Sequence, residues 1–276
     1  MPARARGDGR APGERGGSTA STAASSAIVL AYAPREHTRA RIRASLVRIH
    51  RRGLLVRTER DFTNAFRTHF VNTALVELAA DGDGHGPAEL AREYPSVPFI
   101  ALTPFRPVDA PAIARCAELA FADVLADGTD DGLLGEILLS QGFSARFAAA
   151  LHDPPPPLSL ASPLQLAAWR STIAHAGRPV GTAEVAHSLG VTREHLSRSF
   201  SAGGAPTLKR VLDLVRLLAA GELAKNPGYD LAAVARLVGF ASSAKLSATV
   251  KRLVRAPASA LSALRATDLL ERFLRG

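Results

Sequence analysis

The sequence has one cysteine, one tryptophan and no long apolar run. A single cysteine excludes a disulfide framework and a metal site built from several cysteines, and the helical pattern PAIARCAELA around Cys116 favours a buried thiol. No apolar stretch approaches the roughly 20 residues that span a bilayer. The segment AIVLAYA near the start is too short and too late for a secretory signal. These absences predict a cytoplasmic protein without a membrane partner.

Charge is divided unevenly between the two parts of the chain. Residues 1–162 carry 18 basic and 18 acidic residues, whereas residues 163–276 carry 16 basic and 7 acidic ones. The whole net charge of +9 therefore belongs to the second part. A basic domain joined to a neutral one indicates that the second meets a polyanion, most simply nucleic acid. The alternative is a basic surface that serves only solubility.

Composition divides the chain into four segments. Residues 1–26 combine Arg, Gly, Pro, Ser and Ala without periodicity, which predicts a disordered tail. Four consecutive prolines in HDPPPPLSLASP cannot continue a helix or a strand ladder, so residues 152–162 are expected to form a semi-rigid extended linker. The remaining segments, 27–151 and 163–276, are each long enough for one domain.

Strand and helix patterns alternate between residues 27 and 151. Apolar strand patterns occur at 27–33, 54–59, 73–79, 97–103 and 122–127, and helical patterns at 38–50, 61–70, 87–94, 110–120 and 130–151. Near-continuous apolar strands alternating with helices are typical of a sheet buried on both faces. The first domain is therefore predicted to be α/β, with a doubly wound, five-stranded parallel sheet.

The second domain is predicted to be all-α, with seven helices. Its helices are expected to start at residues that cap helices or at prolines: Ser162-Pro163, Thr182, Thr192, Pro206-Thr207, Asp230, Ser242 and Pro257. Trp169 is interpreted as part of this domain's core.

One pattern in the second domain occurs twice. AEVAHSLGVTREHLSRSF at 183–200 has a near copy, AAVARLVGFASSAKLSATV, at 232–250. In each, an alanine precedes a glycine by four residues: Ala186 and Gly190, then Ala235 and Gly239. The small residue permits close helix approach, and glycine accepts a turn with positive φ. The second turn is expected to be one residue longer, because Gly190 to Leu196 is six steps and Gly239 to Leu246 is seven.

Each copy predicts a helix-turn-helix whose second helix enters the major groove of DNA. The exposed residues of the first reading helix are expected to be Arg193, Glu194, His195, Ser197 and Arg198. Those of the second are expected to be Ser243, Ala244, Lys245, Ser247 and Lys251, with Lys245, Lys251 and Arg252 holding phosphates. The helix expected at 208–226 would set the two reading helices about one turn of B-DNA apart, roughly 34 Å.

This arrangement resembles the DNA-binding domain of the AraC family of bacterial transcription regulators. The resemblance covers about residues 163–265, including RLLAAGELA, VGFASSAKLSATVKRL and Ala256-Pro257. It implies sequence-specific binding to double-stranded DNA by two recognition helices in successive major grooves. The chain departs from the family at Ala248, where arginine is common, and at Arg255, where glycine is common. We therefore expect the first unit to contribute more of the sequence discrimination.

The first domain is similar to the receiver domains of response regulators. A working receiver needs an acidic pair, an acceptor Asp, a hydroxyl and a lysine, because phosphoryl transfer to a carboxylate uses Mg²⁺ and a cation partner. Here these positions fall on Ala31 and Tyr32, Glu77, Thr103 and Asp127, and only Thr103 agrees. The resemblance implies a degenerate receiver, or pseudo-receiver, that is not phosphorylated. Glu77 could imitate a switched-on receiver, or this edge could bind a ligand.

No other constellation indicates chemistry. The chain offers no nucleophile, base and orienting group together, so no enzyme and no cofactor are expected. Asp81 and Asp83 lack the other acids of an EF-hand, and the histidines lack second ligands at metal spacing, so no metal site is expected.

Two hypotheses on function remain. The first is a transcription regulator that dimerises through its first domain, with RNA polymerase or another regulator as a further partner. The second is an interaction protein that has lost autonomous DNA reading and acts on another regulator.

Overall fold

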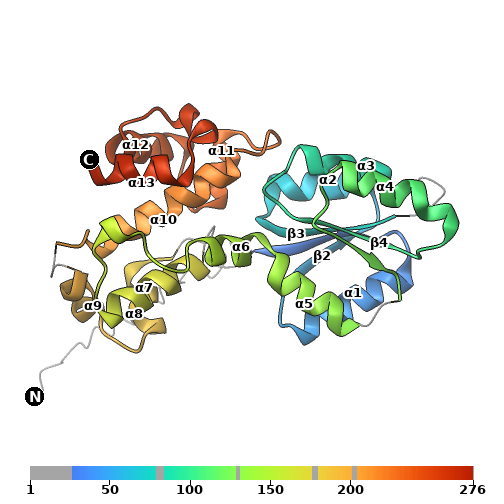
Figure 1. Ribbon diagram of the computed structural model, residues 1–276, viewed down its shortest axis with the longest axis horizontal. Helices are drawn as coiled ribbons and strands as arrows, with labels where there is room; N and C mark the ends of the chain where they lie inside the picture. Colours follow the sequence, from blue (N-terminus) through green and yellow to red (C-terminus); the bar gives the residue numbers. More distant parts are fainter. Residues whose placement is uncertain (1–26, 79–83, 129–130, 176–179, 201–203, 276) are drawn as a thin grey trace, which may run out of the picture.

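The computed structural model describes residues 27–78, 84–128, 131–175, 180–200 and 204–275. The predicted tail at 1–26, and Asp81 and Asp83, lie outside the described residues. Two bodies lie side by side, a sheet covered by helices and a group of helices (Figure 1). None of the described helices has the length and apolar character needed to cross a bilayer.

The first body contains a five-stranded parallel sheet. Its strands are β1 (Ile28–Tyr32), β2 (Gly53–Val56), β3 (Val71–Glu77), β4 (Phe99–Thr103) and β5 (Asp123–Ala126). The order across the sheet is β2-β1-β3-β4-β5, and every neighbouring pair is parallel. This is the order of flavodoxin-like doubly wound folds, which include receiver domains. The prediction of a doubly wound parallel sheet is confirmed.

Helices cover both faces of the sheet, as Figure 1 shows. The elements of this body are α1 (Glu36–Arg48), α2 (Glu59–Thr68), α3 (His85–Glu89), η1 (Leu90–Arg92), η2 (Pro107–Asp109), α4 (Ala110–Glu118) and α5 (Asp131–Gln141). Ile42 of α1 and Leu138 of α5 pack in one core cluster with Leu75 of β3. Phe62 of α2 and Cys116 of α4 belong to the core on the opposite face. Burial raises the pKa of the Cys116 thiol to about 11, as expected for a structural cysteine.

The helix predicted over 130–151 is two helices in the structure. α5 ends at Gln141, and α6 (Phe143–Ala150) begins after an extended residue, Gly142, with ψ of 149°. The Asn72 side chain fills the space where a Cβ at Gly142 would lie, and Asn72 Oδ1 accepts a hydrogen bond from the Ser144 amide at 2.8 Å. A residue of β3 therefore causes the break, which the apolar periodicity does not reveal.

The second body is all-α among the described residues. Its elements are α7 (Pro163–Ala174), α8 (Thr182–Ser188), α9 (Arg193–Phe200), α10 (Leu208–Leu223), α11 (Leu231–Leu237), α12 (Ser243–Val254), η4 (Ala258–Ala263) and α13 (Ala266–Arg275). The prediction of seven helices is confirmed in this part of the chain, and Trp169 is fully buried. The predicted start at Pro257 was wrong for the last α-helix, because the chain first forms the 3-10 helix η4.

The proline-rich segment differs from the extended spacer that its composition predicts. Pro156–Leu158 forms a 3-10 turn, η3, and Leu158 and Leu160 are buried. The Trp169 indole donates a hydrogen bond to the Leu151 carbonyl at 2.9 Å. The leucines that follow the prolines have an apolar surface to bury, so the segment packs against its neighbours instead of standing free.

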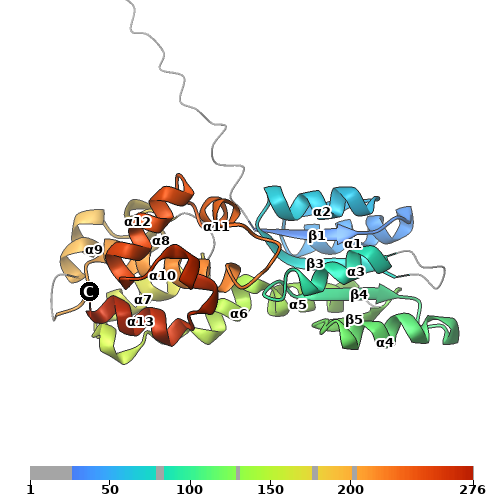
Figure 2. The same ribbon diagram turned by 90° about the horizontal axis from the view of Figure 1, so that it is seen from above.

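A contact region joins the two bodies away from the linker. The hydrogen bonds across it include Ser96 N to Asn226 Oδ1 (2.8 Å), Ser96 Oγ to Glu222 O (2.8 Å) and Gly228 N to Glu93 O (3.1 Å). The buried rings of Tyr94 and Tyr229 meet edge to face at 5.0 Å. The loop between α10 and α11 is therefore docked on the segment between η1 and β4, close to where α11 faces α2 in Figure 2.

Candidate nucleic-acid interface and the receiver-like site

The two repeated turns have the same hydrogen bonds. Gly190 has φ of 67° and Gly239 has φ of 77°. In the first turn, the Val191 and Gly190 amides donate to the Ala186 and His187 carbonyls, both at 3.1 Å. In the second, the corresponding bonds run from Phe240 N to Ala235 O (2.8 Å) and from Gly239 N to Arg236 O (3.1 Å). Both are Schellman motifs, in which glycine supplies the left-handed residue after the helix.

Each turn leads into a capped second helix. The Thr192 hydroxyl accepts a hydrogen bond from the His195 amide at 3.2 Å, and the Ser242 hydroxyl accepts one from the Lys245 amide at the same distance. The cap follows Gly190 by two residues and Gly239 by three, so the second turn is one residue longer, as predicted. Leu196 and Leu246 are fully buried and attach the two helices, α9 and α12, to the domain core.

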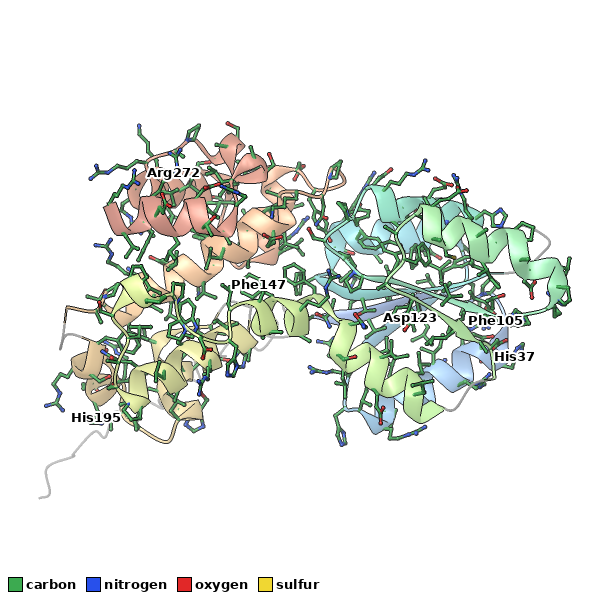
Figure 3. The ribbon with its side chains drawn as sticks, in the orientation of Figure 1. His37, Phe105, Asp123, Phe147, His195 and Arg272 are labelled. Carbon is green, nitrogen blue, oxygen red and sulfur yellow. The ribbon has the colours of Figure 1, made fainter. Side chains whose placement is uncertain are left out.

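The predicted reading residues of α9 lie on its exposed face. Arg193, Glu194, His195, Ser197 and Arg198 are all exposed. Figure 3 shows His195 at the end of the molecule that is opposite to the sheet. Arg198 Nε donates to the Glu194 carbonyl of the same helix at 3.4 Å. Arg193 and His195 form no ion pair within the described part of the chain, so α9 offers cationic and hydrogen-bonding groups to a ligand.

The second reading helix is poorer in available groups. Ala244, Lys245, Lys251 and Arg252 are exposed, whereas Ser243 and Ser247 are half-buried. Arg252 Nη2 lies 3.2 Å from a carboxylate oxygen of Asp213 in α10. The side chain expected to hold a phosphate is therefore already paired with the helix that connects the two units.

That connecting helix, α10, is the centre of the domain. It ends at Leu223 rather than near 226, and 12 of its 16 residues are buried. It packs against α7, α8 and α9 on one side and α11, α12 and α13 on the other. Because α10 is mostly buried and contacts helices of both helix-turn-helix units, it joins the two units in one core.

The carboxyl edge of the sheet brings together the five residues predicted for the degenerate receiver site. Ala31, Tyr32 and Thr103 are buried, and the Thr103 hydroxyl has no hydrogen-bond partner in the described part of the chain. The Tyr32 ring contacts Phe62 edge to face at 6.2 Å. Two buried, uncharged side chains thus stand where a receiver has its acidic pair.

Glu77 and Asp127 share a cation that the sequence reasoning missed. Glu77 is only 2% exposed, and it accepts hydrogen bonds from Thr38 Oγ1 (2.5 Å) and from the Arg35 amide (3.3 Å). The Arg35 guanidinium pairs with Glu77 through Nε and with Asp127 through Nη2 at 3.2 Å. Arg41 Nη1 also lies 3.0 Å from Asp127. The positive charge of this edge therefore comes from the start of α1.

The segment PREHTRAR contains the sequence feature from which these basic partners of Glu77 and Asp127 could have been predicted. It follows β1 directly, so its side chains reach the same sheet edge as Glu77 and Asp127. His37 Nε2 lies 3.6 Å from Asp127, and His37, Glu77 and Asp127 each offer one atom within 4.8 Å of the others. Because Arg35 and Arg41 already place two positive charges on these carboxylates, a divalent cation would have to displace them.

One family model matches part of the chain. Residues 185–263 match the model described as "Helix-turn-helix domain". Comparison with curated protein sequences found no match.

Solved structures similar to the chain include a receiver domain, full-length FixJ and a response regulator. A receiver domain of a sensor histidine kinase from Pseudomonas aeruginosa is 20% identical, over 41% of this chain and 94% of that one, with a TM-score of 0.36. Full-length FixJ from B. japonicum is 12% identical, over 78% and 98%, with a TM-score of 0.38. The response regulator RcsB of Salmonella typhimurium is 15% identical, over 69% and 97%, with a TM-score of 0.35.

The strand order and the covering helices, rather than these scores, define the fold of the first body as receiver-like. The helix-turn-helix match supports a DNA-binding regulator. Residues 185–263 are an AraC-type helix-turn-helix domain, and they follow a domain with the receiver fold.

Proposed function

We propose that this protein is a transcription regulator that binds a specific DNA sequence through α9 and α12 in successive major grooves. The observation that carries the proposal is the repeated Schellman turn, which presents two capped helices from the basic part of the chain. Supporting geometry comes from α10, whose 16 residues are about 24 Å long, a length compatible with reading helices roughly one turn of B-DNA apart.

We further propose that the receiver-like domain, residues 27–151, works without phosphorylation. Ala31 and Tyr32 provide no ligand for Mg²⁺, and the carboxylate of Glu77 is already satisfied by Arg35 and Thr38. The domain then acts through its surface, by dimerisation or by contact with RNA polymerase or another regulator in the bacterial cytoplasm. On this proposal the protein is a regulator rather than an enzyme.

The proposal is tested by selecting bound sequences from a random pool of duplex DNA with the full chain. One enriched motif with two half-sites is the expected result. The affinity for that motif should fall steeply with salt, because phosphate contacts release counterions. Arg193→Ala should weaken binding by roughly 1–3 kcal/mol and relax the preference at one base position. Arg43→Ala removes an equal charge from the exposed surface of α1 and serves as the matched control.

Two outcomes contradict the proposal. One is a selected pool without any enriched motif, and the other is equal affinity of the Arg193→Ala and Arg43→Ala proteins for the enriched duplex. An enriched motif with a single half-site would contradict only the use of α12 as a second reading helix.

The alternative function, an interaction protein that modulates another regulator, is favoured by two features of α12. α12 exposes Ala244 at its reading end, and its Arg252 is paired with Asp213. On this hypothesis the selected pool shows no motif, while the protein still associates with a DNA-bound regulator.

A further inference from the structure

A groove lies between the end of α12 and α13, outside the residues that the sequence analysis assigned to DNA binding. It has a volume of about 490 Å³, and its polar lining comes from Arg255, just after α12, and from Asp268, Glu271, Arg272 and Arg275 of α13. Figure 3 shows Arg272 in the same half of the molecule as His195, far from His37 and Phe105 of the receiver-like domain.

The two acids of the groove each form an ion pair with an arginine. Asp268 accepts hydrogen bonds from the Arg265 amide at 3.0 Å and from Arg265 Nε at 3.4 Å. These bonds hold the pKa of Asp268 below its usual value, so its charge is present at neutral pH. Glu271 pairs with Arg275 at 3.2 Å. Arg255 and Arg272 form no ion pair with a carboxylate in the described part of the chain, although Arg272 lies near enough to Asp268 to help lower the pKa of that carboxyl. With Arg275 they give the groove three guanidinium groups against two carboxylates, an excess of positive charge.

Arg255 extends a stripe on the recognition helix. Ala244, Ala248, Lys251 and Arg255 follow one another at intervals of four, three and four residues, and all four are exposed. This spacing puts Ala244, Ala248 and Lys251 on one face of α12, and Arg255 follows as the residue at which the helix ends. The first half of the stripe is small and uncharged, and the second half is basic. Arg252 lies outside the stripe and is paired with Asp213.

The backbone at Arg255 also departs from the usual choice at such a position. Arg255 has φ of 53° and ψ of 37°, the left-handed conformation in which a helix commonly ends with glycine. A Cβ disfavours this conformation, so arginine at this position carries a conformational cost, as do the left-handed His50 and Ala120 after α1 and α4. The exposed side chain of Arg255 lines the same groove as Arg272.

From these observations we propose that Arg255 and Arg272 form a binding site for the sugar–phosphate backbone of duplex DNA, next to the groove that α12 enters. The inference rests on the proposed function. Ala244 and Ala248 let the helix approach the base edges closely, as small side chains do beside thymine methyl groups. Lys251, Arg255 and Arg272 then hold the adjoining phosphates and give the second unit affinity in place of base discrimination.

The test uses the full chain and the duplex enriched in the selection, with the dissociation constant measured over a series of KCl concentrations. Arg255→Gly removes the charge and relieves the backbone at the same position. We expect this protein to have an unchanged or higher melting temperature and yet to bind DNA about 5- to 20-fold more weakly, with a salt slope reduced by about 1. Arg272→Gln should reduce the slope by a similar amount, and the double variant by about 2. Arg43→Gln on α1 is the matched control.

The loss of DNA affinity must be the same for duplexes of different sequence, because a phosphate contact carries no base preference. If Arg255→Gly and Arg272→Gln keep the wild-type affinity and salt slope while Arg193→Ala loses specificity, the groove inference is wrong and the proposed function stands. A change of preferred base in either variant would make its arginine a base reader and overturn the backbone assignment. If the wild type binds no duplex in a salt-dependent way, the proposed function itself fails.

Discussion

At the scale of single residues, Arg35 changes the interpretation of the receiver-like site. The sequence comparison counts Asp127 as a reversed charge at the position of the receiver lysine. In the structure, the Arg35 guanidinium bridges Asp127 and Glu77, and Arg41 adds a second cation. The edge is thus an internally paired cluster, in which the carboxylate that would accept phosphate is occupied by groups of the same chain.

This pairing predicts that the protein does not accept a phosphoryl group. We expect no increase in intact mass after incubation with acetyl phosphate and Mg²⁺, because Ala31 and Tyr32 cannot hold the ion and Glu77 is bonded to Arg35 and Thr38. Mass spectrometry of the wild type and of Glu77→Gln checks this. Phosphorylation of the wild type that disappears in Glu77→Gln would contradict the prediction.

At the scale of elements, the first helix-turn-helix unit depends on Gly190 for its backbone conformation and not for space. No heavy atom outside the adjacent residues lies within 4 Å of a Cβ built at Gly190, and the φ of this residue is 67°. Glycine is therefore needed at position 190 only because the backbone there is left-handed.

Gly190→Ala is accordingly expected to lower the free energy of unfolding by about 1 kcal/mol, since alanine is disfavoured in the left-handed region. Gly190→Asn should lower the free energy of unfolding by less, because asparagine tolerates the left-handed conformation. Denaturation in urea measures both values. Equal stability of the alanine variant and the wild type would show that the turn adopts another conformation in solution.

The break between α5 and α6 belongs to the same scale and illustrates a limit of periodicity. DDGLLGEILLSQGFSARFAAAL has apolar residues enough for one helix, and Gly142 alone does not require a break. The decisive group is Asn72, which accepts a hydrogen bond from Ser144 and occupies the space beside Gly142. Asn72 belongs to a strand and lies 70 residues before Gly142, so the apolar pattern around Gly142 holds no information about it.

At the scale of the whole molecule, the docked loop couples the two bodies. A Cβ at Gly228 would overlap the ring of Tyr94, and the Ser96 hydroxyl and amide bind the end of α10 and the residues that follow it. Burial raises the pKa of both Tyr94 and Tyr229, so both phenols are neutral near pH 7. The receiver-like domain thus touches the segment that connects the two helix-turn-helix units.

We expect Gly228→Ala to separate the unfolding of the two bodies. The wild type should unfold in one calorimetric transition, and the variant in two, because the added methyl group pushes Tyr94 out of the contact. In a protein that already carries Tyr94→Ala, Gly228→Ala should lower the stability little further, because the ring that the methyl group collides with is absent. An additive effect of the two substitutions would argue against this contact in solution.

Local features of the chain were sufficient to predict the order of the strands and helices, the two glycine turns and the division of charge. Each of these depends on residues close together in the sequence, where alternation, helix caps and the φ of a glycine act directly. Arg35 between Glu77 and Asp127, Arg252 on Asp213 and Tyr94 against Tyr229 required the folded protein. These pairs join residues 39 to 135 positions apart, and chain folding alone brings such groups within hydrogen-bond or van der Waals distance.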